Sequence, residues 1–187
     1  MPQLRYNVAT TLDGYIASSN GSTDWIVEDS SIDFEALYRE FDFFVMGRKT
    51  YEVMVALGAP SENPLFKRPK NAVIVASRTM RPEDFPNITV ISENIVDFIR
   101  DLKSGNGKDI WLMGGGTLAT QCLEAGLLNS IEAAVMPVIL GDGIRMIEEF
   151  DRSPAKLNLT GYLLSQFNNA SYRVMNDGVN TNSPTGE

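Results

Sequence analysis

A glycine-rich segment at residues 109–119 has the composition of an anion-binding loop. Residues 110–113 (IWLM) predict a buried strand, Gly114, Gly115 and Gly116 follow, and residues 117–123 predict a helix. A strand that breaks at glycines into a helix presents bare backbone N–H groups and the positive end of a helix dipole, which bind phosphate. The same glycines would also let a strand and a helix pack closely, so this segment alone does not separate the two interpretations.

Two other expected strands also end in polar residues that suit phosphate. The strand at residues 42–46 leads into Gly47, Arg48, Lys49 and Thr50, and the strand at residues 71–76 leads into Ser77, Arg78 and Thr79. Cations at the start of a helix oppose the helix dipole, so a bound anion would explain Arg48 and Lys49.

In a parallel α/β sheet these three strand ends lie along one edge, where such folds bind ligands. A dinucleotide with a 2′-phosphate fits this edge, with its pyrophosphate on two helix N-termini and its extra phosphate on Arg48, Lys49 or Arg78. No G-x-G-x-x-G follows the first expected strand and no Walker-type motif is present. The nucleotide-binding fold predicted here is therefore an unusual one.

The elements that must position these residues follow from hydrophobic patterning. Strands are expected at residues 4–10, 42–46, 71–76, 88–91, 110–113, 131–136, 155–165 and 170–175. Helices are expected from Ser30 or Ser31 to Phe41, from Arg48 onward, and at residues 95–103 and 117–125. Strands that alternate with helices predict a mainly parallel sheet covered on both faces, and the last two strands predict an antiparallel hairpin at one edge. One domain is expected over residues 1–176, followed by a flexible polar tail at residues 177–187.

Composition excludes several classes of protein. The net charge of −8 argues against nucleic acid or an anionic membrane as a partner. The chain has one cysteine, Cys122, and no histidine, which excludes an internal disulfide and an imidazole base and argues against a metal site. Without a membrane-length apolar run or a signal peptide, the chain is expected to be cytoplasmic.

Six short segments occur in an order that is more specific than any one of them: residues 11–17 (TLDGYIA), 24–25 (DW), 45–52 (VMGRKTYE), 77–79 (SRT), 112–118 (LMGGGTL) and 137–143 (PVILGDG). Together they resemble the dihydrofolate reductase superfamily, in particular the branch that includes the C-terminal reductase domain of riboflavin biosynthesis. The resemblance covers about residues 4–175. It implies a three-layer α/β/α fold with a mainly parallel mixed central sheet, NADPH as the hydride donor and a homodimer.

The resemblance also implies which residues hold the cofactor. It places the backbone of Val8 and Ala9 at the nicotinamide amide, and Leu12 and Gly14 in a flexible loop over the cofactor. The pyrophosphate side would comprise Gly47, Arg48, Lys49, Thr50, Gly114, Gly115, Gly116, Thr117 and Leu118, and Met113 before the glycines is a further candidate cofactor contact. The adenosine 2′-phosphate would lie near Ser77, Arg78 and Thr79.

The implied reaction transfers hydride to a small heterocycle of pterin or aminopyrimidine type. Without histidine, a carboxyl group or an ordered water must deliver the proton. Asp33 is the candidate acid, and Asp13, Trp25 and Arg39 are candidate substrate contacts. Each has a simpler interpretation as well. Asp33 is favoured as a helix N-terminal charge, Asp13 suits a turn, Arg39 an exposed helical position, and Trp25 the edge of the core.

Two alternative functions remain open. Met113 stands where the riboflavin-pathway reductases carry a substrate-binding glutamate, so the step that reduces 5-amino-6-(5-phosphoribosylamino)uracil is a related reaction rather than an assigned one. A true dihydrofolate reductase is one alternative, and an NADP(H)-binding protein that has lost catalysis is another. A mononucleotide kinase is disfavoured because no lysine follows the glycines.

Overall fold

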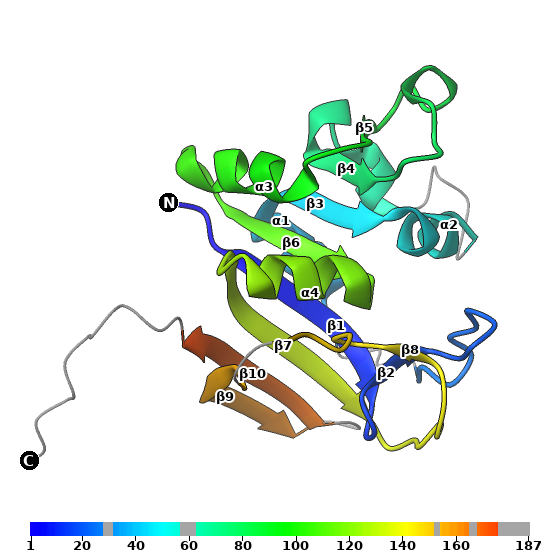
Figure 1. The fold of residues 1–187 in the computed structure, drawn as a ribbon, viewed down its shortest axis with the longest axis vertical. Coiled ribbons are helices and arrows are strands. Elements are labelled where there is room, and N and C mark those ends of the chain that lie inside the picture. Colours follow the sequence, from blue (N-terminus) through cyan, green and yellow to red (C-terminus); the bar gives the residue numbers. More distant parts are fainter. Residues whose placement is uncertain (28–31, 57–62, 152–153, 165–167, 176–187) are drawn as a thin grey trace, which may run out of the picture.

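An eight-stranded sheet forms the centre of the fold (Figure 1). The computed structural model describes residues 1–27, 32–56, 63–151, 154–164 and 168–175. In sheet order the strands are β5 (Thr89–Ile91), β4 (Val73–Ala76), β3 (Phe41–Gly47), β6 (Asp109–Gly114), β1 (Leu4–Thr11), β7 (Leu128–Met136), β10 (Asn168–Met175) and β9 (Lys156–Leu164). Pairing is parallel from β5 to β7, and β10 is antiparallel to both of its neighbours. The expected mixed sheet with a late antiparallel pair is confirmed.

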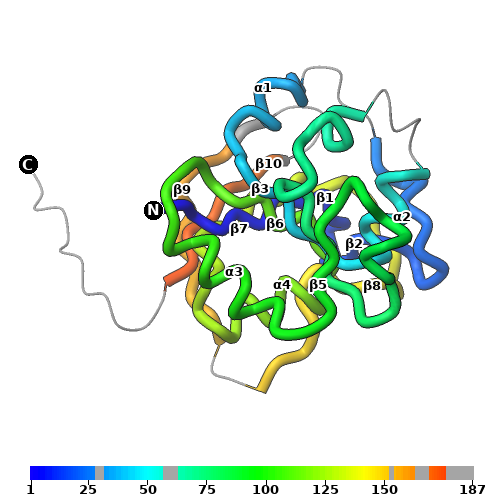
Figure 2. The backbone as a smooth tube through the Cα atoms, turned by 90° about the horizontal axis from the view of Figure 1, so that it is seen from above, coloured from blue at the N-terminus to red at the C-terminus, as the bar shows by residue number. Residues whose placement is uncertain are grey.

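Helices cover both faces of this sheet. Helices α3 (Ile95–Ser104) and α4 (Gly116–Glu124) lie on one face, and α1 (Phe34–Arg39) lies on the other (Figures 1 and 2). Helix α2 (Arg48–Ala56) follows β3 directly, and three short 3₁₀ turns complete the helical segments: η1 (Pro64–Lys67), η2 (Lys70–Ala72) and η3 (Pro82–Asp84). No helix in the described part of the chain is long and apolar enough to cross a membrane.

Alternating side chains of the central strands build two cores. On one face Tyr6, Val45 and Leu112 pack with Ile99 of α3 and Cys122 of α4. Burial raises the pKa of the Cys122 thiol to about 12, so this cysteine stays protonated and acts as a packing residue.

The other core is largely aromatic. Phe44 of β3 and Trp111 of β6 pack with Tyr38 of α1, and the ring centroids of Tyr38 and Trp111 lie 5.2 Å apart. Both faces of β3 and β6 are therefore buried, which explains why these strands are almost continuously apolar. The three-layer α/β/α arrangement is confirmed.

The structure differs from the sequence-based expectation in local details. The helix expected to begin at Ser30 or Ser31 and to reach Phe41 spans only Phe34–Arg39, because Asp33 caps its start and Phe41 already belongs to β3. Ser30 and Ser31 lie outside the described residues, as do the tail at 177–187 and residues 165–167 of the late hairpin. Asn168 and Asn169, expected in its turn, belong to β10. The structure also contains an unpredicted antiparallel pair, β2 (Tyr15–Ala17) with β8 (Ile144–Arg145). Strands this short have no detectable periodicity.

Truncation of the central strand tests this core. Leu112 on β6 is fully buried, so Leu112→Ala should lower the free energy of unfolding by about 2–5 kcal/mol through lost contacts and a residual cavity. The matched control is Leu159→Ala on β9, where the side chain is 57% exposed and the change should stay within about 0.5 kcal/mol. Urea unfolding measures both values, and equal losses would contradict the described packing.

Candidate active site

The candidate site opens where β1 and β6 separate. Strand β1 pairs with β6 only as far as Tyr6 opposite Leu112, whereas its pairing with β7 continues to Thr11. At the point of separation the indole Nε1 of Trp111 donates a hydrogen bond of 3.0 Å to the backbone carbonyl of Asn7. Beyond this bond a cleft of about 1720 Å³ extends along the carboxyl ends of the parallel strands. Ligands of open α/β sheets bind at this place.

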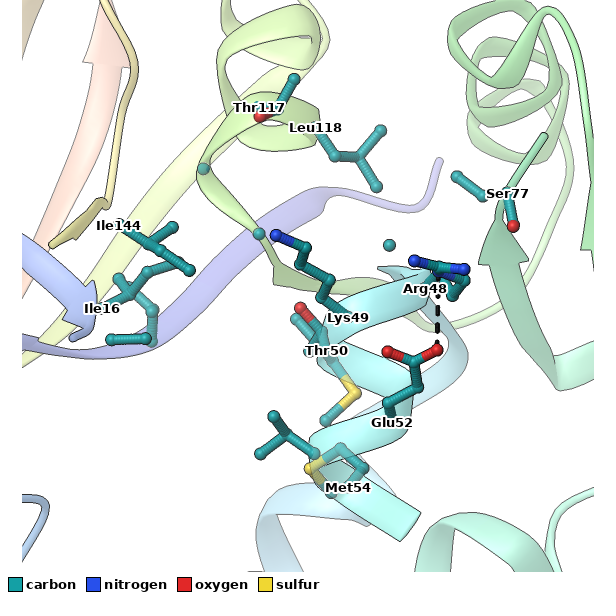
Figure 3. Close-up of a pocket in the computed structure, with 18 of the residues that line it drawn as sticks. Ile16, Arg48, Lys49, Thr50, Glu52, Met54, Ser77, Thr117, Leu118 and Ile144 are labelled. Carbon is teal, nitrogen blue, oxygen red and sulfur yellow. Dashed lines mark ion pairs between the residues drawn. The ribbon is translucent and has the colours of Figure 1, made fainter. Parts of the chain in front are cut away.

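The three polar strand ends lie at this one cleft. Among the residues that line it are Val8, Ala9, Gly47, Arg48, Lys49, Thr50, Ser77, Arg78, Met113, Gly115, Gly116, Thr117 and Leu118. Figure 3 shows Arg48, Lys49 and Thr50 on α2, Ser77 at the end of β4, and Thr117 and Leu118 on α4 around the same space. The ends of β3 and β6 are adjacent, because a Cβ on Gly47 would lie 3.8 Å from the backbone nitrogen of Gly115.

Two helices direct their N-termini at the cleft without an acidic residue in the first turn. Helix α4 begins at Gly116 after Gly115, which provides no side-chain cap. Helix α2 begins with Arg48 and Lys49. The first N–H groups of a helix have no partner within the helix, and its dipole adds positive potential there. Both features favour an anion with at least two charges, such as a pyrophosphate.

Arg48 is oriented by neighbours rather than left free. Its Nη1 donates to Oγ1 of Thr79 at 3.2 Å, and its Nε lies 3.5 Å from Oε1 of Glu52 (Figure 3). Oγ of Ser77 accepts from the backbone nitrogens of Thr79 and Met80, which closes the turn after β4. Thr79 is absent from the cleft lining, and its contact with Arg48 links the start of α2 to this turn.

The three glycines after β6 serve different purposes. A Cβ on Gly116 would lie 2.0 Å from the carbonyl oxygen of Arg145, so close packing explains this glycine. Gly114 has a φ of +110°, which favours glycine, and does not line the cleft. A Cβ on Gly115 would meet nothing nearer than 3.9 Å. Packing therefore accounts for Gly116 and backbone conformation for Gly114, while Gly115 presents its backbone to the cleft.

The candidate acid and one candidate substrate contact serve structural roles outside the lining. Asp33 accepts a hydrogen bond of 2.9 Å from the backbone nitrogen of Ala36 and so caps α1. Asp13 accepts from the hydroxyl of Thr11 at 2.6 Å and from the backbone nitrogens of Leu140 and Gly141. The Thr11 hydrogen bond is the largest cause that lowers the pKa of Asp13 below its ordinary value. These contacts fit the helix-cap and turn interpretations.

Four more predicted residues are absent from the lining: Leu12, Gly14, Trp25 and Arg39. Leu12 is 68% exposed, and Gly14 turns the chain with a φ of +84°. Arg39 is exposed at the end of α1, where its carbonyl accepts a hydrogen bond from Lys108. The buried Nε1 of Trp25 has no hydrogen-bond partner among the described residues.

Several lining residues escaped the sequence analysis, among them Asn7, Ile16, Ser92, Glu93, Asn94 and Ile144. Residues 92–94 follow β5 as a fourth polar strand end, so the signal used for the other three could have found them. Ile16 and Ile144 come from the short β2–β8 pair, which has no sequence signal. Asn7 is a half-buried position on β1, and an alternating strand alone does not mark such a residue as functional.

Comparison with known proteins defines first the class of fold and then the family. Dihydrofolate reductase from Enterococcus faecalis, solved in complex with NADP(H), superposes with a TM-score of 0.63 over 93% of this chain and 97% of that one, at 16% identity. The fold is therefore dihydrofolate reductase-like. The family model of the RibD C-terminal domain matches residues 2–165, and the chain belongs to this family.

Two relatives in sequence agree with this family. The uncharacterized protein YyaP of Bacillus subtilis (strain 168) is 32% identical over 143 residues, which are 73% of this chain and 76% of YyaP. The riboflavin biosynthesis protein RibD of Mycobacterium tuberculosis is 26% identical over 176 residues, which are 89% of this chain and 50% of RibD. The chain thus spans half the length of that RibD.

The different purposes of the glycines can be tested by adding one methyl group. Gly116→Ala forces a Cβ against backbone of Arg145 and should cost about 3 kcal/mol of unfolding free energy, at the upper end of overpacking effects. Gly115→Ala is the control and should cost about 1 kcal/mol or less, as expected for alanine at a helix N-cap. Chemical denaturation compares the two, and equal costs would show that the approach to Arg145 does not select glycine.

Proposed function

We propose that this chain is an NADPH-dependent reductase that transfers hydride to a small heterocyclic substrate of pterin or aminopyrimidine type. The observation that carries the proposal is the convergence of two uncapped helix N-termini and the cations Arg48, Lys49 and Arg78 on one cleft. Membership of the RibD C-terminal domain family and a fold shared with an enzyme solved with NADP(H) support it.

The residues present fit such a cofactor along the length of the cleft. The N–H groups at the starts of α2 and α4 would hold the pyrophosphate, with Lys49 and Thr50 beside it. Arg78 and Ser77 would receive the 2′-phosphate, which suits the charge-assisted hydrogen bonds of a guanidinium. The open edge of β1 at Val8 and Ala9 would hold the nicotinamide amide through backbone groups. When bound, NADPH supplies the hydride.

The chain's own residues then orient and enclose the reactants. Trp111, Met113 and Ile16 line the cleft with apolar surface, which would exclude water from the face that receives hydride. Asp33, the carboxyl that the resemblance suggests for proton delivery, caps α1 and does not line the cleft. An ordered water is the other proton source compatible with a chain that lacks histidine.

Cofactor choice gives a direct prediction. Arg78 is exposed at the cleft and has no ion pair among the described residues, so Arg78→Ala should weaken NADPH binding about tenfold by removing a charge-assisted contact with the 2′-phosphate. NADH lacks that phosphate, and its affinity should change by less than about threefold. The control is Arg81→Ala, three residues along the chain, where the guanidinium pairs with Asp84 outside the lining. Fluorescence titration measures all affinities.

Equal loss of NADPH and NADH affinity in Arg78→Ala would contradict the placement of the 2′-phosphate.

The class of reaction is tested by following NADPH oxidation across pterins, aminouracil phosphates and quinones. Methotrexate-sensitive turnover of dihydrofolate would favour a true dihydrofolate reductase. Tight NADPH binding without turnover on any substrate would favour a non-catalytic NADP(H)-binding protein.

A further inference from the structure

Asn7 is a polar side chain at the place where the cleft begins. It lies on β1 directly before Val8, lines the cleft, and shares this region with Trp111. Its Nδ2 donates a hydrogen bond of 3.1 Å to Oε2 of Glu132 on β7. Its backbone carbonyl accepts from the indole of Trp111. Asn7 is therefore held both through its backbone and through one end of its side-chain amide.

Glu132 is held in turn by Arg5. Nε of Arg5 donates to Oε1 at 2.6 Å and Nη2 donates to Oε2 at 2.8 Å, a two-point ion pair in which the two side chains are only 17% and 21% exposed. Nη1 of the same guanidinium donates to Glu40 at 2.7 Å. The guanidinium carbon Cζ of Arg5 lies 4.6 Å from the ring centre of Phe41. The pKa of Arg5 is raised, chiefly by its hydrogen bond to Glu132. The pair is thus charged and fixed in orientation.

The fixed carboxylate decides which way the Asn7 amide faces. A carboxylate accepts hydrogen bonds and cannot donate them, so it must meet the NH₂ end of the amide. The opposite end, Oδ1, is left as an acceptor with no partner among the described residues. The indole N–H of Trp111 cannot serve it, because that donor already binds the Asn7 carbonyl. The cleft is therefore lined by a residue whose amide oxygen is kept as an acceptor by a carboxylate outside the lining.

We infer that Asn7 is a specificity-determining residue that selects heterocycles carrying an N–H or amino donor. The inference rests on the proposed function and deepens it by naming a chemical feature of the substrate. A ligand donor would complete the hydrogen bonds of Oδ1, whereas a ligand acceptor at the same place would leave two lone-pair groups facing each other. A binding site that hydrogen-bonds a polar group of its substrate strongly rejects analogues without that group, because the polar group of the protein is then left unpaired.

The competing explanation is that Asn7 only braces Glu132 between β1 and β7. In that case the substitution of Asn7 would change stability and leave ligand preference unaltered. The ratio of affinities for two matched ligands separates these explanations, because a bracing role has no reason to change it.

The test uses the full chain with two probes, 2,4-diaminopyrimidine and 2,4-dimethoxypyrimidine, which share the ring nitrogens and differ in amino donors against methoxy acceptors. Calorimetric titration is carried out with and without saturating NADPH. The wild-type chain should bind the diamino probe at least about tenfold more tightly. Asn7→Leu, of similar shape, should reduce this preference to less than about threefold while the Kd for NADPH changes less than about twofold. Asn158→Leu on the exposed face of β9 is the matched control and should keep the wild-type preference.

Glu132→Gln provides a second variant that leaves Asn7 in place. A glutamine amide both donates and accepts, so the Asn7 amide becomes free to turn and the preference should fall here too. Retention of the full preference in Asn7→Leu and Glu132→Gln, or its absence in the wild-type chain, would overturn the inference. A parallel loss of NADPH affinity in Asn7→Leu would also overturn it, by placing Asn7 in the cofactor half. Failure of NADPH to bind would instead defeat the proposed function, and the titrations without NADPH would still decide the role of Asn7.

Discussion

The separation of β1 from β6 after Tyr6 is the constraint on which the site depends. Up to that residue the two strands share a parallel ladder, and beyond it β1 continues with β7 alone. The indole of Trp111 donates to the carbonyl of Asn7 where the ladder ends, so this carbonyl keeps a partner. A buried carbonyl without a donor would cost free energy comparable to a lost hydrogen bond. The open edge of β1 and the glycine-rich start of α4 then border the same space.

Positive groups gather at two helix starts in this space although the chain as a whole is acidic. The net charge is −8, and the cleft lining contains the carboxylates Glu52, Glu93, Asp97 and Glu148 as well as the cations Arg48, Lys49 and Arg78 at and near two helix N-termini. At physiological ionic strength exposed charges separated by more than about 8 Å are largely screened, so the groups nearest to the two helix starts matter most for a ligand bound there. On the other side of Asn7, the pair of Arg5 and Glu132 provides a fixed negative acceptor. We therefore propose that one end of the cleft binds the phosphates of the cofactor. At the other end, Asn7 would accept a hydrogen bond from an N–H or amino group of the substrate.

The parts that the sequence predicted well have strong local signals. Glycines and cations that follow apolar strands led to the residues around Gly47, Ser77 and Gly115, and the alternation of strands with helices led to a mainly parallel sheet covered on both faces. Features made by distant or very short segments could not be predicted. Asn7 and Glu132 are 125 positions apart, and β8 has only two residues. The homodimer and the cytoplasmic location stay predictions.

The central claim is that three strand ends form one site for the pyrophosphate and the 2′-phosphate of NADPH. A crystal structure of the chain with NADPH bound tests it most directly. The account predicts the pyrophosphate at the N-termini of α2 and α4, the 2′-phosphate at Arg78, and the nicotinamide against Val8 and Ala9. A nucleotide bound away from these strand ends, or phosphates that contact neither helix start, would contradict the account.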